Sequence, residues 1–156
     1  MKYETPKTEL PTRPRLRRLA GVVVAGVLAT ALLAGCLSED QSTVQNQINS
    51  SRAAAGVQRL ADYGTSDTKA QNWANYLASI GTIKHSNLTD GYQSGTWCRL
   101  GENVGMGPSL SAIHSAFMNS PSHRANILSP YYDHIGTGVA KRGNTYYVVH
   151  EFADLC

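Results

Sequence analysis

Three short segments dominate the interpretation of this sequence: KHS at residues 84–86, GENV at 101–104 and SPSHRANIL at 120–128. They hold two histidines and one acid, in the order His85, Glu102 and His123, separated by 17 and 21 residues. Imidazole and carboxylate groups bind divalent metals and transfer protons in many proteins. We therefore treat these three side chains as the candidate site.

Four helical stretches surround these segments. Apolar residues recur every three or four positions in each, and a glycine follows the first two. In the second stretch, Ser66 or Asp67 is expected to cap the helix start. In the fourth, Ser120 and Pro121 are of the types favoured before and at a first helical residue. The expected helices cover about 41–55, 68–80, 109–119 and 121–127.

Two β-rich segments close the chain, HIGTGVA at 134–140 and TYYVVHEFA at 145–153, with Gly143-Asn144 as the turn between them. His150 and Glu151 are neighbours on the second strand, so they point to opposite faces and cannot act as a pair. Helices followed by a terminal hairpin predict an α+β domain. The glycine-rich stretch 84–108 is expected to be irregular, and long loops of this kind often carry function.

Residues 1–35 have the composition of an export signal. Six Lys and Arg and only two Glu lie in residues 2–18, followed by an uncharged stretch at 19–35. An uncleaved transmembrane helix is the alternative, because this stretch is close to the shortest that spans a bilayer. Its end, LAGC at 33–36, resembles the bacterial lipobox, in which the cysteine is lipidated and everything before it is removed. We expect a signal peptide over 1–35, a lipidated tether over 36–41 and one domain over 42–156.

Removal of residues 1–35 would change the charge of the protein. The full chain has 14 Lys and Arg against 11 Asp and Glu, a formal charge of +3. Without the leader, eight basic and nine acidic residues would remain, a net charge of about −1. The remaining sequence has no basic stripe, so a nucleic-acid partner is not expected.

The three cysteines fit an exported protein. With Cys36 assigned to the lipid, Cys98 and Cys156 form an even pair in an oxidising compartment, and we expect a disulfide between them. Such a bond closes a loop of nearly sixty residues, which the chain-entropy argument values at roughly 4 kcal/mol. Two free thiols are the alternative.

The three segments of the candidate site, in this order and spacing, resemble the CAP superfamily of cysteine-rich secretory, antigen-five and pathogenesis-related-one proteins, and most closely its bacterial branch. The segment NQINSSRAAAGV, the Trp73 helix and the closing hairpin resemble it too, so the likeness covers about 42–153. It implies an α-β-α sandwich with a central antiparallel sheet and a cavity lined by two histidines and two acids. His85, His123 and Glu102 match three of these four positions. Residues 117–120, where the second acid is expected, hold no carboxylate.

Three roles remain open for His85, Glu102 and His123. They could bind Zn²⁺ or another divalent cation with one position open to water. Glu102 could instead act as a base in a metal-dependent secreted hydrolase or peptidase that uses both histidines. The three side chains could also form a structural cluster of hydrogen bonds.

The missing second acid, together with the absence of a recognisable nucleophile and base, favours a binding module over an enzyme. The expected protein is a lipoprotein held by its lipid on Cys36 to the outer face of the bacterial cell membrane. Its expected ligand is a lipid, a glycan or an envelope protein.

Overall fold

The computed structural model of this protein describes residues 37–156. The expected signal peptide and the lipid site at Cys36 lie outside the described residues. Among residues 37–156, no helix is both long and apolar enough to cross a membrane. This part of the chain contains two hydrophobic clusters and a disulfide. It therefore has the core that a domain needs to fold without residues 1–36.

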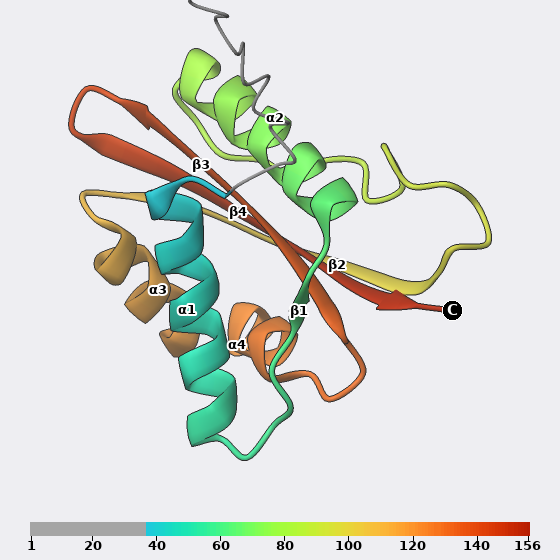
Figure 1. The fold of residues 1–156 in the computed structure, drawn as a ribbon. Helices are drawn as coiled ribbons and strands as arrows, with labels where there is room; N and C mark the ends of the chain where they lie inside the picture. Colours follow the sequence, from blue (N-terminus) through green and yellow to red (C-terminus); the bar gives the residue numbers. More distant parts are fainter. Residues whose placement is uncertain (1–36) are drawn as a thin grey trace, which may run out of the picture. The chain divides into compact units, whose positions relative to one another are not determined.

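A four-stranded sheet forms the middle layer, in the order β1-β3-β4-β2 (Figure 1). The three long strands pair antiparallel, as expected, and the two-residue strand β1 adds a short parallel pairing with β3. The long strand β2 pairs only with β4, so it lies at one edge of the sheet, next to the segments that carry the candidate site. The strands are β1 (Ala61–Asp62), β2 (Trp97–Gly107), β3 (His134–Arg142) and β4 (Thr145–Leu155).

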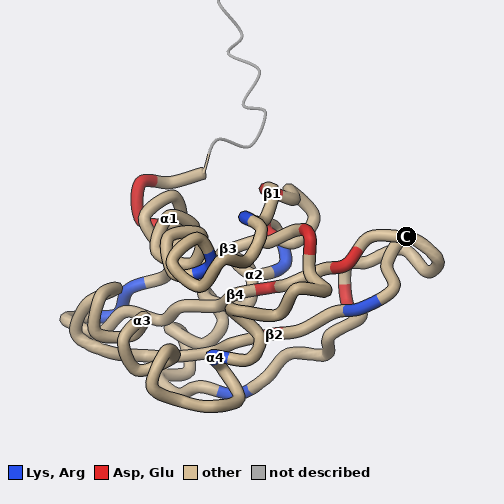
Figure 2. Tube along the Cα trace, turned by 90° about the horizontal axis from the view of Figure 1, so that it is seen from below, with Lys and Arg blue, Asp and Glu red and all other residues tan. Residues whose placement is uncertain are grey.

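Four helices cover the two faces of this sheet, and Figure 1 shows α2 on one side with α1, α3 and α4 on the other. The protein is thus the α-β-α sandwich that the sequence predicts. Lys and Arg lie on several separate segments of the described chain, interspersed with Asp and Glu (Figure 2). The helices are α1 (Glu39–Ala54), α2 (Gly64–Ile80), α3 (Leu110–Asn119) and α4 (Pro121–Leu128).

Successive side chains of β4 point to opposite faces of the sheet, as the sequence pattern predicts, so the strand contributes to two separate hydrophobic clusters. Val148 and Phe152 pack with apolar residues of α1, α3 and α4. Tyr147 and Val149 face the other way and pack against alanines and Leu77 of α2. The strand therefore has no solvent-exposed face, and any polar residue in its middle must find a partner inside the protein.

Two helices begin earlier than expected. A capping box, in which Ser38 and Gln41 satisfy each other's backbone N–H groups, starts α1 at Glu39, so the polar segment expected to be a tether gives way to helix there. In α2 the expected caps are wrong, because Ser66 and Asp67 lie inside the helix. Asp67 instead accepts a hydrogen bond from the backbone N–H of Thr137 on β3, 2.8 Å away.

The expectation of irregular structure over 84–108 is wrong for residues 97–107, which form β2. Its glycines lower β propensity, and this obscured the strand in the sequence. The structure shows why they are there: a Cβ on Gly101 would lie 2.3 Å from the hydroxyl of Tyr132, and one on Gly105 would lie 2.7 Å from the ring of Phe117. These glycines let side chains of the neighbouring elements approach the strand closely.

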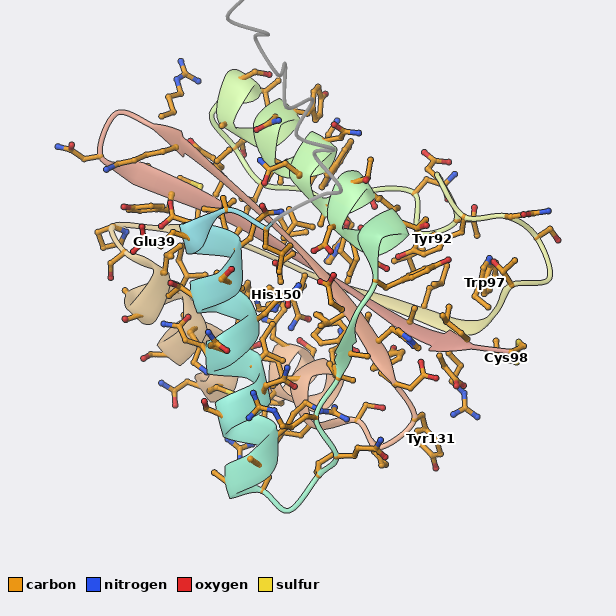
Figure 3. The ribbon with its side chains drawn as sticks, viewed as in Figure 1. Glu39, Tyr92, Trp97, Cys98, Tyr131 and His150 are labelled. Carbon is orange, nitrogen blue, oxygen red and sulfur yellow. A yellow bond between two sulfur atoms is a disulfide. The ribbon has the colours of Figure 1, made fainter. Side chains whose placement is uncertain are left out.

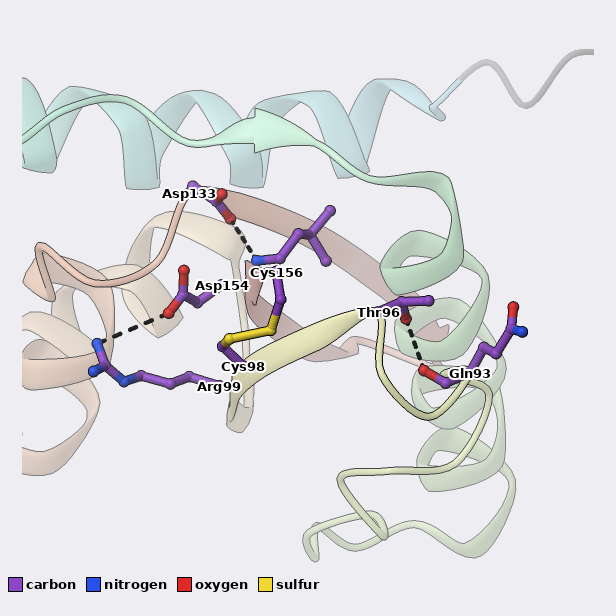
Figure 4. Close-up of a disulfide and its surroundings, with 8 residues drawn as sticks. Gln93, Thr96, Cys98, Arg99, Asp133, Asp154 and Cys156 are labelled. Carbon is purple, nitrogen blue, oxygen red and sulfur yellow. Dashed lines mark hydrogen bonds and ion pairs between the residues drawn. A yellow bond between two sulfur atoms is a disulfide. The ribbon is translucent and has the colours of Figure 1, made fainter.

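A disulfide joins Cys98 near the start of β2 to Cys156 at the end of β4, which confirms the predicted pairing (Figure 4). The two cysteines are 58 residues apart in sequence, so their link restricts the unfolded chain strongly. An ion pair between Arg99 and Asp154, 3.8 Å apart, lies beside it. The disulfide thereby fixes the end of the edge strand that carries Glu102.

Candidate functional site

The three predicted site residues come from three different elements. His85 lies in the segment between α2 and β2, Glu102 lies in the middle of β2, and His123 lies in the first turn of α4. The edge position of β2 allows the segment of His85 and the helix of His123 to approach it from different layers. The structure brings His85 and Glu102 into direct contact, whereas His123 makes its closest polar contacts with other residues.

The buried carboxylate of Glu102 contacts the imidazole of His85. The imidazole Nδ1 of His85 lies 2.5 Å from Oε1 of Glu102, and the backbone N–H of Ser86 donates to the same oxygen at 3.0 Å. Glu102 is only 5% exposed, whereas the side chain of His85 is 65% exposed. A carboxylate in this position selects the imidazole tautomer that carries its proton on Nδ1. The Nε2 atom of His85 is then an exposed acceptor on a ring of fixed orientation.

His123 is held by its own helix and by a network of amides. Its Nδ1 lies 2.9 Å from the hydroxyl of Ser120, and its ring centroid is 4.9 Å from that of Phe117. Burial lowers the pKa of His123, and the charge of His85 lowers it further. His123 is therefore neutral at physiological pH.

Two asparagines connect His123 to the strand of Glu102. Asn103 donates from its side-chain amide to the backbone oxygen of His123 at 3.1 Å. Asn126 donates to Asn103 at 2.9 Å and to the backbone oxygen of Glu102 at 3.3 Å. These bonds fix the start of α4 against β2, so the two histidines belong to one rigid framework.

A cleft of about 420 Å³ opens beside the His85–Glu102 pair. Its walls combine the imidazole with apolar side chains and one amide, which is the composition of many ligand sites. Its main lining residues are His85, Leu88, Leu100, Glu102, Asn126 and Tyr132.

A second buried carboxylate lies next to Glu102, although it does not line the cleft. Glu151 of β4 lies directly opposite Glu102 of β2 in the antiparallel register and is fully buried. The ammonium of Lys69 on α2 contacts Glu151 and donates to the hydroxyl of Ser86 at 2.7 Å. The hydroxyl of Ser86 is thereby engaged by the Lys69–Glu151 ion pair.

Burial raises the pKa of Glu151 above its ordinary value, the contact with Lys69 opposes this rise, and the like charge of Glu102 adds to it. Sequence reasoning missed this pair, although one signal was present. An acid at Glu151 alternates with Tyr147 and Val149 on a strand face that is otherwise apolar, and a buried acid needs a cationic partner.

The arrangement does not fit a three-ligand zinc site. Among residues 37–156, no group of three or more His, Cys, Asp or Glu side chains is placed to hold a metal ion. The physical reason is that Glu102 already accepts from His85 and from the backbone of Ser86. These contacts place Glu102 where it can orient the imidazole of His85, and the roles of metal ligand and general base stay predictions.

His150 lies on the opposite face of β4 from Glu151, as expected, near the middle of the sheet (Figure 3). It is completely buried between Phe117, at 4.8 Å between ring centroids, and Phe152. Within the described residues its Nδ1 has no hydrogen-bond partner. Burial, with smaller contributions from His114 and His123, lowers its pKa to about 3. His150 is a neutral core residue and takes no part in the candidate site.

This burial predicts acid sensitivity. His150 binds a proton near pH 6.5 in the unfolded chain but only near pH 3 in the folded chain. The contribution of the neutral His150 to the free energy of unfolding is therefore complete above pH 6.5 and is lost as the pH falls towards 3. Between pH 7 and 4 this amounts to about 3 kcal/mol. Urea unfolding at both pH values should therefore show a smaller loss for His150→Leu than for the wild type. An equal loss in both proteins would contradict this role of His150.

Comparison with known proteins identifies the fold. The profile of the Cysteine-rich secretory protein family (CAP) matches residues 45–152. No curated protein sequence matches the chain. An outer surface protein of Borrelia burgdorferi is 23% identical with a TM-score of 0.70, over 76% of this chain and 95% of that protein.

Two further structures share this fold. An extracellular protein of Bacillus anthracis that contains an SCP domain is 17% identical with a TM-score of 0.63, over 77% of this chain and 45% of that protein. NaASP2, solved with Zn²⁺, is 16% identical with a TM-score of 0.50, over 76% of this chain and 82% of that protein. At these identities the likeness establishes the fold, and the chemistry must come from the residues of this chain.

Proposed function

This chain belongs to the cysteine-rich secretory protein (CAP) family. We propose that it is an exported binding module, tethered by a lipid on Cys36 to the outer face of a bacterial membrane. Its ligand, a lipid, glycan or envelope protein, is bound in the cleft beside His85. The observation that carries the proposal is the contact between the buried carboxylate of Glu102 and the exposed imidazole of His85.

The contact supports recognition better than hydrolysis. Glu102 is buried and accepts hydrogen bonds from fixed partners, so it orients His85 and is poorly placed to take a proton from water. The one serine beside His85, Ser86, is held by Lys69. The ring of His85 is fixed through Nδ1, and its Nε2 makes no hydrogen bond within residues 37–156, so it suits a hydrogen bond or a coordination bond to a ligand.

We extend the proposal to a divalent cation held by two imidazoles. The Nδ1 atom of His85 contacts Glu102, and the Nδ1 atom of His123 contacts Ser120. Among the described residues, the Nε2 atoms of both histidines are therefore left to coordinate a metal ion. Glu102 then takes the position of an outer carboxylate that orients a metal-binding histidine. The zinc in NaASP2 supports this extension. A bound cation would add positive charge at the cleft and attract carbonyl or anionic groups of a ligand.

Hydrolysis by His85, Glu102 and His123 is the competing function, and assays of turnover separate the two. We expect casein and p-nitrophenyl acetate to be hydrolysed no faster by the zinc-supplemented wild type than by the double variant His85→Ala, His123→Ala. A rate that falls by roughly a hundredfold or more in the folded double variant would overturn the binding proposal, because general acid–base catalysis contributes at least that much.

The lipid tether makes a separate prediction. Replacing Cys36 with alanine removes the acceptor for the lipid, so the protein should move from the membrane fraction to the soluble fraction when cells are fractionated. The relatives described as outer surface and extracellular proteins support an exported location. Tight membrane association of the Cys36→Ala protein would instead indicate an uncleaved membrane helix within residues 1–35.

A further inference from the structure

We propose that a second pocket, between α2 and residues 86–91, binds the ring of a neutral saccharide. The pocket has a volume of about 430 Å³ and is separate from the cleft of His85, although Ser86 lies between the two. The proposal stands whether or not the His85 cleft binds a metal. We define this α2 pocket by Thr65, Thr68, Asn72, Trp73, Asp90 and Gly91.

One wall of the α2 pocket is a helix face with regularly spaced polar groups. Thr65, Thr68 and Asn72 lie three and four residues apart, so they line the same side of α2. Asn72 is exposed, and within the described residues its amide makes no hydrogen bond. The helix therefore offers the amide of Asn72 and the hydroxyl of Thr65 along a rigid element, and the hydroxyl of Thr68, which donates to the backbone oxygen of Gly64 at 2.8 Å, can still accept a hydrogen bond.

Trp73 gives the pocket an aromatic side chain that is already fixed in place. Its indole N–H donates to the backbone oxygen of Lys84 at 2.9 Å, and its ring centroid lies 4.9 Å from that of Tyr76. The ammonium of Lys84 lies 5.7 Å from the centroid of the indole. Because the ring is held from several sides, a ligand that packs on it loses little binding free energy to ordering the side chain.

The opposite wall is a tight turn that presents one carboxylate. Asn87 donates to the carboxylate of Asp90 at 2.7 Å, and the backbone N–H of Asp90 donates to the oxygen of Asn87 at 3.1 Å. Gly91 follows with a φ of +84°, and a Cβ there would come within 3.9 Å of Lys69 on α2. The turn thus fixes the position of Asp90 in the wall of the pocket.

The charges of the lining exclude an anionic ligand. The ammonium of Lys69 lines the pocket, but it contacts the buried Glu151, so its charge is compensated inside the protein. Asp90 on the other wall is exposed and would repel a phosphate or carboxylate. A neutral ligand is therefore favoured.

The pattern of polar groups also distinguishes a sugar from a lipid chain. An acyl chain laid along α2 would remove the hydroxyl of Thr65 and the amide of Asn72 from water without giving them partners, which is costly. A saccharide ring has both an apolar face of C–H groups for Trp73 and hydroxyls for Asn72 and Asp90. A saccharide ring therefore has partners for both the aromatic and the polar residues that line the α2 pocket.

The fluorescence of Trp73 provides a direct test. The chain holds two tryptophans, and Trp97→Phe leaves Trp73 as the only emitter. Trp97 tolerates this change because its indole N–H is buried and, within residues 37–156, has no hydrogen-bond partner. The Trp97→Phe form of residues 37–156 is titrated with cellobiose, maltose and N,N′-diacetylchitobiose, and in parallel with dodecanoate. We expect a saturable change in emission with at least one of the three sugars.

Matched variants locate the site. Asn72→Ala should weaken sugar binding by roughly fivefold to tenfold, the effect of one lost hydrogen bond. Asn75→Ala, the same change at an exposed position one turn further along α2, should leave the affinity unchanged, and so should His85→Ala. The proposal is overturned if none of the three sugars saturates the signal. It is equally overturned if Asn72→Ala binds sugar as tightly as its parent, or if dodecanoate saturates the signal and Asn72→Ala abolishes that.

Discussion

Replacing Gly138 with alanine is expected to leave the domain without a stable fold. Gly138 belongs to the IGTG segment of β3, over which α2 passes at very close range. A Cβ at this position would lie 2.0 Å from the backbone oxygen of Ala70 and 2.2 Å from its carbonyl carbon. Backbone atoms of a helix cannot rotate aside as a side chain can, so the whole of α2 would have to move off the sheet.

That movement would expose the core on the α2 side, where Ala70, Ala74 and Leu77 pack against β4. We expect a loss of about 4 kcal/mol or more, at the extreme of single-residue effects. The matched control is Gly64→Ala at the first residue of α2, where a Cβ meets no heavy atom within 4 Å and φ is not positive. Its stability in urea unfolding should stay close to that of the wild type. A Gly138→Ala protein within about 1 kcal/mol of the wild type would contradict the described packing of α2 on β3.

Removing the positive charge of Lys69 is the second change with a large expected effect. Lys69→Met leaves Glu151 buried without its cation and opposite the carboxylate of Glu102. Loss of one partner of a buried ion pair costs about 3–5 kcal/mol. The double variant Lys69→Met, Glu151→Leu removes both charges and should recover most of this loss. Lys84→Met, a change of an exposed lysine, should stay within about 0.5 kcal/mol of the wild type.

The pH dependence of the Lys69→Met deficit checks its cause. Without Lys69, nothing opposes the rise that burial causes in the pKa of Glu151, so the free-energy cost of burying this acid in the variant grows as the pH rises above its unfolded pKa of about 4.5. A protonated Glu151 needs no cation, and the difference between variant and wild type should therefore shrink as the pH is lowered to 5. A deficit that is equal at pH 5 and pH 8 would mean that Lys69 stabilises the protein through packing alone.

Local signals in the sequence were sufficient for much of the fold. Ser120 and Pro121 mark the start of α4 because capping and first-turn preferences depend only on neighbouring residues. The hairpin of β3 and β4 follows from alternation and from its Gly143 turn. The pairing of Cys98 with Cys156 follows from assigning the third cysteine to the lipid, an assignment that remains a prediction.

Contacts between distant segments account for what the sequence did not predict. Strand β2 was missed because its glycines, including Gly101 and Gly105, are required by Tyr132 and Phe117, which come later in the chain. Asp67 was taken for a cap because its partner on β3 lies 70 residues away. The Lys69–Glu151 pair forms because α2 packs against β4. The two residues are 82 positions apart in sequence, so no local pattern could predict their contact.

The same limit applies to the candidate site. The motifs placed His85, Glu102 and His123 in one region, and the structure agrees that all three elements meet at β2. The sequence could not show that Glu102 would be buried under His85 and engaged by the backbone of Ser86. From this contact we propose that Glu102 orients His85, a role different from the metal ligand or base that the motifs predict.

The role of Glu102 is tested most directly by calorimetric titration of Zn²⁺ into the metal-stripped chain from residue 37 onward. The same titration is made with Glu102→Gln and with the double variant His85→Ala, His123→Ala. We predict that the wild type binds one equivalent, that the double variant binds none, and that Glu102→Gln still binds about 10- to 100-fold more weakly, as for a residue that orients a ligand. No binding by the folded wild type would contradict the two-imidazole site. Binding lost as completely in Glu102→Gln as in the double variant would show that Glu102 is itself a ligand.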